Sequence, residues 1–141
     1  MKRQALIIVA VAAILAEFLV GCENTGFAGT DAPFGSSVRI VHISPPTSSV
    51  VHVDDRLSVL VEAEYSLTAD SGVVSLIIQG SDIFPIAQDT QVVTKGAGKL
   101  TLKAEVVVPD TKAIQVFTPL SAEGQGITTT VDHRAYKVLP K

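Results

Sequence analysis

Residues 57–67 read LSVLVEAEYSL and alternate between two kinds of side chain along their whole length. The odd-numbered positions are apolar or aromatic, and the even-numbered positions are serine, glutamate and one leucine. Successive side chains of a β-strand point to opposite faces, so a period of two indicates a strand with one dry and one wet face. This segment therefore predicts an antiparallel strand that packs on a core with one face only.

The same period recurs on both sides of this segment, with turn residues between the runs. Residues 83–94 contain Pro85, which cannot donate to a strand ladder, and they are expected to form an edge strand plus a loop. No helical period and no internal repeat follows the N-terminal region. The other expected strands are residues 38–43, 50–53, 73–79, 100–108, 113–120 and 127–138.

Turns and one bulge complete the expected strand pattern. Tyr136 and Val138 fall out of register with Ile127 and Val131, so a β-bulge at residues 132–134 is expected to return them to the core face. Residues 95–99 (KGAGK) are expected to form a hairpin turn with two solvated lysines, because no helix follows them to complete a phosphate site. The expected turns are 54–55, 69–72, 80–82 and 95–98.

About seven short strands within residues 38–139 predict an all-β domain, a single antiparallel β-sandwich. The layout resembles immunoglobulin-like and fibronectin type III-like domains of bacterial surface proteins. Three features carry the resemblance: the alternating strand that ends in Tyr65-Ser66-Leu67, the strand at residues 96–109, and the closing strand with Tyr136 and Val138. The cysteine pair and the tryptophan of true immunoglobulin domains are absent.

The N-terminal region has the layout of an export signal. Lys2 and Arg3 precede a continuous apolar run at residues 5–16, which spans about 18 Å as a helix and is too short for the ~30 Å hydrocarbon core. Extending the run would place Glu17 in the bilayer at a cost of a few kcal/mol. A cleaved signal is therefore favoured over a permanent membrane helix.

Leu19-Val20-Gly21-Cys22 ends this signal and contains the only cysteine of the chain. The four residues resemble the lipobox of bacterial lipoproteins. That resemblance implies that Cys22 carries a diacylglycerol and becomes the mature N-terminus, with an N-linked acyl chain such as palmitate. Glu17 departs from such signals, which are normally uncharged there. The alternative is an ordinary secreted protein whose cysteine is incidental.

The lipobox divides the chain into three parts. Residues 1–21 are the expected signal peptide, residues 22–37 a lipid-anchored flexible tether, and residues 38–141 the immunoglobulin-like β-sandwich. The resemblance implies a location in the cell envelope. If the source is Gram-negative, Glu23 after the anchor favours the outer membrane, because an aspartate there is associated with retention in the inner membrane.

Composition excludes several functions. The net charge is −3, aromatic residues make up 5% and tryptophan is absent, which argues against nucleic-acid binding and against a stacking platform. The one cysteine leaves no disulfide. No nucleophile elbow or other catalytic constellation is found, so no catalytic residue is assigned, and no cofactor is expected apart from the lipid.

His42 and His52 are the only weak candidates for a metal site. They could face each other if the chain folds back at Pro45-Pro46, but two imidazoles alone make an incomplete zinc site. Two hypotheses remain open. The first is a non-enzymatic binding or structural module whose docking patch, against another envelope protein, would use the exposed apolar side chains of Leu60, Ile77 and Phe117. The second is an accessory subunit, or a metal-binding or enzymatic envelope protein, with a loop site near the two histidines.

Overall fold

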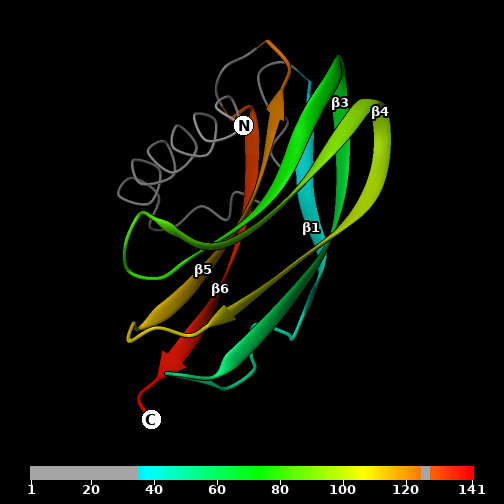
Figure 1. Ribbon diagram of the computed structural model, residues 1–141. Helices are drawn as coiled ribbons and strands as arrows, with labels where there is room; N and C mark the ends of the chain where they lie inside the picture. The colour runs from blue at the N-terminus through cyan, green and yellow to red at the C-terminus, as the bar shows by residue number, and fades with distance from the viewer. Residues whose placement is uncertain (1–34, 125–127) are drawn as a thin grey trace.

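A computed structural model describes residues 35–124 and 128–141, so the predicted signal peptide, Cys22 and most of the predicted tether lie outside the described residues. The described part of the chain forms six β-strands (Figure 1). Their bounds are β1 Ser37–Ser44, β2 Val51–His52, β3 Arg56–Gln79, β4 Pro85–Val107, β5 Ala113–Ala122 and β6 Thr130–Leu139.

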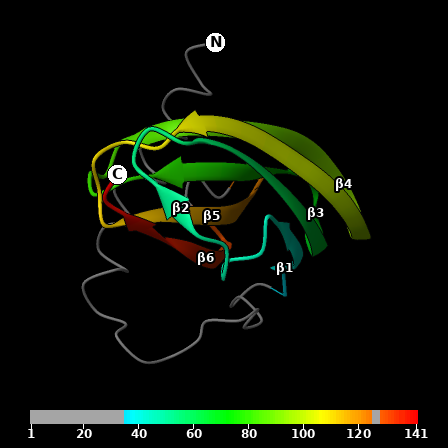
Figure 2. The same ribbon diagram turned by 90° about the horizontal axis from the view of Figure 1, so that it is seen from below.

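The strands form one hydrogen-bonded sheet in the order β1-β3-β5-β6-β2, with β4 paired to β3. All pairs are antiparallel except the short β2–β6 pair. The first part of β3 lies between β1 and β4, and its last part lies between β4 and β5. The sheet therefore folds into two layers. The first layer contains β1, the first part of β3 and the last part of β4, and the second contains the last part of β3, the first part of β4, β5, β6 and β2. Figure 2 shows β5 and β6 across from the curved β3–β4 hairpin. The predicted all-β sandwich is confirmed.

The expected turns at residues 69–72 and 95–98 are wrong, because both segments lie inside long strands. They lie opposite each other in the β3–β4 hairpin, where Leu67 pairs with Gly96 and Ser71 with Thr94 across a register shift. The two turn-forming sequences thus make one shared bend, at which both strands cross from one layer to the other. Gly96 has a φ of 111°, which an L-residue adopts only under strain. Six strands, two of them long and sharing one bend, replace the larger number of short separate strands expected.

The core lies between the two layers and uses the predicted face of the central strand. Val59, Val61 and Ala63 are fully buried, and Tyr65 packs at the margin of the same cluster. Other fully buried members come from both layers and include Val38, Val74, Leu76, Leu102, Ile114, Val116, Leu120 and Tyr136. The predictions of turns at residues 54–55 and 80–82 are also confirmed. Residues 85–94 lie at an edge of the sheet as expected, but they are the first part of the long strand β4 and not a separate strand plus loop.

The expected bulge in the last strand is absent, because β5 and β6 pair without a register shift from Ala113–Lys137 to Leu120–Thr130. Tyr136 and Val138 face the core as predicted, but the residue that shares their face near the start of the strand is the buried Asp132 and not Val131. Val131 therefore lies on the outer face. The Tyr136 hydroxyl donates to the Pro45 carbonyl at 2.6 Å, and burial raises the pKa of Tyr136 to about 12.

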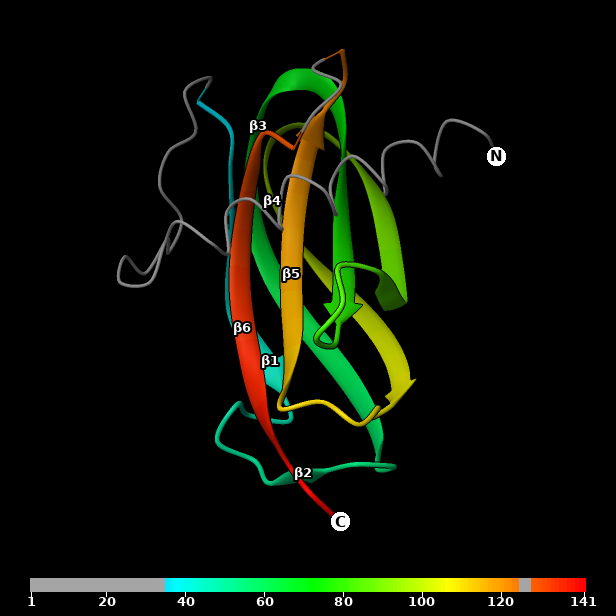
Figure 3. The same ribbon diagram turned by 90° about the vertical axis from the view of Figure 1, so that its left-hand side faces the viewer.

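Asp132 and Arg134 join β6 to the edge of β1, which belongs to the other layer. The Ile40 amide donates to Asp132 Oδ2 at 2.7 Å, and Arg134 Nη2 donates to the Ile40 carbonyl at 3.1 Å. Arg134 Nη1 also pairs with Asp132 Oδ1 at 2.9 Å. Figure 3 shows β1 alongside β6 on this side of the sandwich. The side chains of Asp132 and Arg134 thus satisfy the backbone amide and carbonyl of Ile40, as a neighbouring strand otherwise would.

Asp89 and Gln91 make the equivalent link on the opposite side of the sandwich, between the two halves of β4. The Lys103 amide donates to Asp89 Oδ2 at 3.0 Å, and Gln91 Nε2 donates to the Thr101 carbonyl at 2.7 Å. We call these two links the seams of the sandwich. At each seam an aspartate accepts from a backbone amide of an edge strand, and the residue two positions later donates to a backbone carbonyl of the same strand. Unpaired strand edges are satisfied in this way on both sides of the fold.

Candidate functional site

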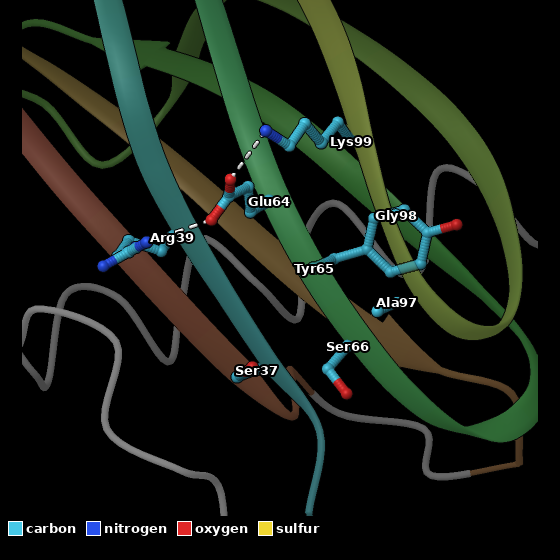
Figure 4. A pocket seen from close by; sticks show the side chains of 8 residues that line it. All are labelled: Ser37, Arg39, Glu64, Tyr65, Ser66, Ala97, Gly98 and Lys99. Atoms are coloured by element: carbon cyan, nitrogen blue, oxygen red, sulfur yellow. Dashed lines mark hydrogen bonds and ion pairs between the residues drawn. The ribbon is translucent and has the colours of Figure 1, made fainter.

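Three charged side chains from three adjacent strands meet on the outer face of the first layer. The register places Arg39 of β1 opposite Glu64 of β3, and Glu64 opposite Lys99 of β4. Because directly opposed residues point to the same side of a sheet, the three side chains form a row with the carboxylate in the middle. Figure 4 shows this row from close by.

Glu64 binds both of its cationic neighbours. Arg39 Nη2 lies 2.9 Å from Glu64 Oε2, and Lys99 Nζ lies 3.1 Å from Glu64 Oε1. The two cations are well exposed, with side-chain exposed fractions of 60% for Arg39 and 79% for Lys99. Each cation can therefore offer its remaining donors to a ligand without losing its contact with Glu64.

The two cations hold the pKa of Glu64 below its ordinary value of 4.5, the hydrogen bond from Lys99 being the larger cause and that from Arg39 the second. A carboxylate with a lowered pKa stays ionised at neutral pH and is a weak base, whereas a general acid or base works best with a pKa near the working pH. The arrangement therefore suits the binding of a ligand better than proton transfer.

An open pocket of about 570 Å³ surrounds this row. Ser37 and Ser66 extend the polar floor because they pair with each other in the β1–β3 register. Glycine is needed at position 98, because a Cβ there would lie 2.7 Å from the Tyr65 hydroxyl, and Figure 4 shows the Tyr65 ring lying across the strand at that point. The full lining is Ser37, Arg39, Glu64, Tyr65, Ser66, Ala97, Gly98 and Lys99.

Glu64→Gln is expected to lower the stability of the domain at neutral pH and to have little effect at low pH. A group whose pKa is lowered in the folded state stabilises that state fully above the ordinary value of 4.5, and this contribution is lost as the pH falls through the lowered pKa. Thermal unfolding of both proteins at pH 7 and pH 3 measures the difference. High salt at pH 7 should also reduce the difference, because the cluster is exposed.

The matched control is Glu62→Gln, two residues earlier on the same face of β3. Glu62 lies opposite Thr101 and His42 rather than between a lysine and an arginine. A loss of stability for Glu62→Gln as large and as pH-dependent as that for Glu64→Gln would contradict a specific role of the Arg39–Glu64–Lys99 row.

The structure does not bring His42 and His52 together, so the arrangement that would have made them a weak candidate metal site is not formed. β1 pairs with β3, whereas β2 pairs with β6 at the far end of the strand order. His42 lies opposite Glu62, and His52 Nδ1 lies 3.7 Å from Asp55 Oδ2. Within residues 35–124 and 128–141, no group of three or more histidine, cysteine, aspartate or glutamate side chains is arranged to hold a metal ion.

The prediction of an exposed patch of Leu60, Ile77 and Phe117 is wrong for two of the three residues. Ile77 and Phe117 lie on the outer face of the second layer, but their exposed fractions are 1% and 2%. They are directly opposed in the β3–β5 register and form a separate apolar cluster with Val131. Leu60 is half-buried in the part of β3 that belongs to the first layer, so the three do not form one patch.

His133 completes this outer cluster by stacking on Phe117, with ring centroids 4.9 Å apart. Burial lowers the pKa of His133, and the nearby Arg134 lowers it further, against an opposing effect of Asp132. The imidazole also contacts the Gln115 side-chain oxygen through Nε2. Its neutral form is therefore favoured, as suits a ring packed on an apolar neighbour.

Two of the sequence predictions fall outside the described residues. The lipid attachment site Cys22 and the signal peptide precede residue 35, so they remain predictions. In the part of the chain that the structure covers, no helix has the length and hydropathy of a membrane span.

Sequence reasoning missed the Arg39–Glu64–Lys99 row and interpreted Lys99 as a solvated residue of a turn. Glu64 was correctly placed on the wet face of its strand, but nothing in the order of residues indicates which strands lie on either side of it. A register that aligns residues 25 and 35 positions away from Glu64 comes only from the folded sheet.

Comparison with known proteins supports the fold and leaves the function open. No protein-family model matches the chain, and no curated protein does. A glycosyl hydrolase family 2 member from Bacteroides cellulosilyticus is similar to it with a TM-score of 0.50, 14% identity and coverage of 80% of this chain. A β-glucuronidase from glycoside hydrolase family 2 has a TM-score of 0.50, 10% identity and coverage of 72%.

These likenesses show the class of the domain, an all-β fold of the β-sandwich kind. The matched region is only 14% of the first of these chains and 11% of the second. The chain therefore corresponds to one small β-sandwich domain of much longer proteins.

Proposed function

We propose that this protein is a lipid-anchored module of the bacterial cell envelope that acts by binding or by a structural role, and not as an enzyme. The observation that carries the proposal is the position of the only cysteine, directly after Leu19-Val20-Gly21 and behind a basic and an apolar segment. Two or three acyl chains on one residue are enough for stable anchoring, since each buried CH₂ contributes about 0.8 kcal/mol.

The chemistry of the described surface supports binding over catalysis. The Arg39–Glu64–Lys99 row offers donors on both sides of an ionised carboxylate, in an open pocket with two serine hydroxyls. Such a set can recognise a polar ligand that has both donors and acceptors. The lowered pKa of Glu64 makes it a poor proton donor or acceptor at neutral pH.

The partner in this proposal is another protein of the envelope, for which the chain serves as an accessory domain. The structurally similar glycoside hydrolases contain a domain of this kind as a small part of a long chain. This is an analogy of architecture alone. The metal-binding form of the second hypothesis, with a site at His42 and His52, loses its basis because the strands that carry the two histidines are not neighbours.

The intact mass of the protein purified from membranes tests the proposal. The expected species begins at Cys22 and is heavier than its peptide by a diacylglycerol and one further acyl chain. A Cys22→Ser variant provides the control and should appear as an unmodified, uncleaved chain. A wild-type mass without lipid, or a mature chain that begins elsewhere, would overturn the proposed anchorage.

A further inference from the structure

The loop between β3 and β4, together with the first two residues of β4, exposes three large apolar side chains close together. The exposed fractions are 49% for Ile83, 71% for Phe84 and 43% for Ile86, and Pro85 lies between the last two. The loop projects from the side of the sandwich, at the left of Figure 1. Scattered exposed apolar residues are normal, but several such residues grouped on one loop indicate a contact surface.

Hydrogen bonds at its base hold this loop in its conformation. Gln79, which is 3% exposed, donates from Nε2 to the Ile83 carbonyl at 2.8 Å. The hydroxyls of Ser81 and Thr111 lie 2.5 Å apart and connect the loop to the segment before β5. The apolar side chains are therefore presented by an ordered loop, and little further conformational entropy is lost when they are covered.

The charge around the loop restricts the kind of surface that could cover it. Residues 79–94 contain no lysine or arginine, and their only charges are Asp82 and Asp89. Asp89 already accepts the Lys103 amide. This region therefore lacks the basic residues that attract nucleic acid or anionic lipid headgroups. Its exposed apolar side chains and lack of positive charge suit contact with an uncharged, apolar phase.

We propose that Ile83, Phe84 and Ile86 insert into the interfacial region of the bilayer that carries the lipid anchor. This inference rests on the proposed anchorage for the presence of a bilayer. Twelve residues separate Cys22 from Gly35, and they can span up to about 40 Å when extended. The ten-residue strand β5 is about 33 Å long, so the tether is long enough for the domain to lie on its side.

A single tryptophan introduced at position 84 tests the insertion, because the natural chain contains none. Lipidated Phe84→Trp protein is reconstituted into phosphatidylcholine vesicles with and without lipids brominated in the acyl chain. The matched control is lipidated Val50→Trp, since Val50 is 66% exposed in another loop. The expected result is a blue shift and quenching of the tryptophan emission for Phe84→Trp, with no change for Val50→Trp.

The dependence of the quenching on salt concentration and on the lipid headgroup distinguishes apolar insertion from electrostatic attachment. Quenching of the Phe84→Trp emission should persist at high salt and should not increase when anionic lipid is added, because the loop has no basic residue. Quenching that appears only with anionic lipid, and disappears in high salt, would overturn the proposal.

Flotation of the same vesicles separates this inference from the proposed anchorage. If the protein floats but the emission of Phe84→Trp is quenched no more than that of Val50→Trp, the insertion is refuted and the anchorage stands. If the protein does not float, the anchorage fails, and titration with excess vesicles decides the insertion by the presence or absence of a blue shift in Phe84→Trp. A blue shift of this variant that depends on protein concentration without vesicles would show self-association and overturn the proposal.

Discussion

Val61→Asp is expected to abolish the cooperative unfolding transition of the domain. Val61 is fully buried in β3, at the centre of the core between the two layers. A carboxylate at this position has no partner and would have to be buried as a charge, or be protonated at a large cost at neutral pH. Either cost is comparable with the whole stability of a small domain, about 5–15 kcal/mol. Thermal unfolding followed by far-ultraviolet circular dichroism measures the result.

Leu60→Asp is the matched control for this variant. Leu60 precedes Val61 in the same strand, points to the outer face and lies opposite Lys103. A carboxylate there can remain hydrated beside a lysine, so the variant should unfold cooperatively with a small change in midpoint. If Val61→Asp melted cooperatively, or Leu60→Asp did not, the assignment of the two faces would be wrong.

Asp132→Asn is expected to destabilise the domain by about 3 kcal/mol, since it breaks a buried, charged hydrogen-bond network. The two carboxylate oxygens of Asp132 accept from the Ile40 amide, the His133 amide and Arg134 Nη1. An asparagine side chain has one acceptor oxygen, so its amide nitrogen would face a donor. Urea unfolding at pH 7 should show a lower midpoint with an unchanged m-value.

Asp89→Asn makes the same chemical change at the other seam of the sandwich. Asp89 is only half-buried and its bond to the Lys103 amide is open to solvent, so water can replace the lost acceptor. The expected loss is about 1 kcal/mol or less. Equal losses of stability for Asp132→Asn and Asp89→Asn would show that burial does not determine how much each hydrogen-bonded link contributes to the free energy of unfolding.

The two seams also protect the edges of the sandwich. Ile40 in β1, and Thr101 and Lys103 in β4, have backbone groups that point away from their strand partners. Open groups of this kind are templates for pairing with another chain. At each seam an aspartate and a donor two residues later form hydrogen bonds with these backbone groups inside the molecule. The spacing of two residues acquires this meaning only once the arrangement of the layers is known.

Local pattern was sufficient to identify most strand-forming segments and most of their buried faces, but not the continuity of β3 and β4 through residues 69–72 and 95–98. The alternation of residues 57–67 correctly placed Val59, Val61 and Ala63 in the core, because the period of two is a property of the strand itself. The same reasoning failed for Asp132. A polar residue at a core-facing position interrupted the pattern and suggested a bulge, whereas the structure uses that residue to bind the edge of a distant strand.

The segments at residues 69–72 and 95–98 show where turn chemistry is ambiguous. Glycine and aspartate favour sharp local geometry, which can reverse a chain or bend two paired strands together. Here the two segments lie opposite each other, and the hairpin stays paired through the bend. Only the pairing of β3 with β4 distinguishes these outcomes, and pairing depends on residues that are far apart in the chain.

The all-β character, the sandwich architecture and the burial of the central strand's apolar face followed from the sequence alone, since all three depend on side-chain patterns within short segments. The predicted lipid anchor also depends on the order of adjacent residues, and its test is chemical. The Arg39–Glu64–Lys99 row, the separation of His42 from His52 and the burial of Ile77 and Phe117 were decided by tertiary structure. Each of these depends on which strands are neighbours and in what register, and strand register is a property of the folded sheet as a whole.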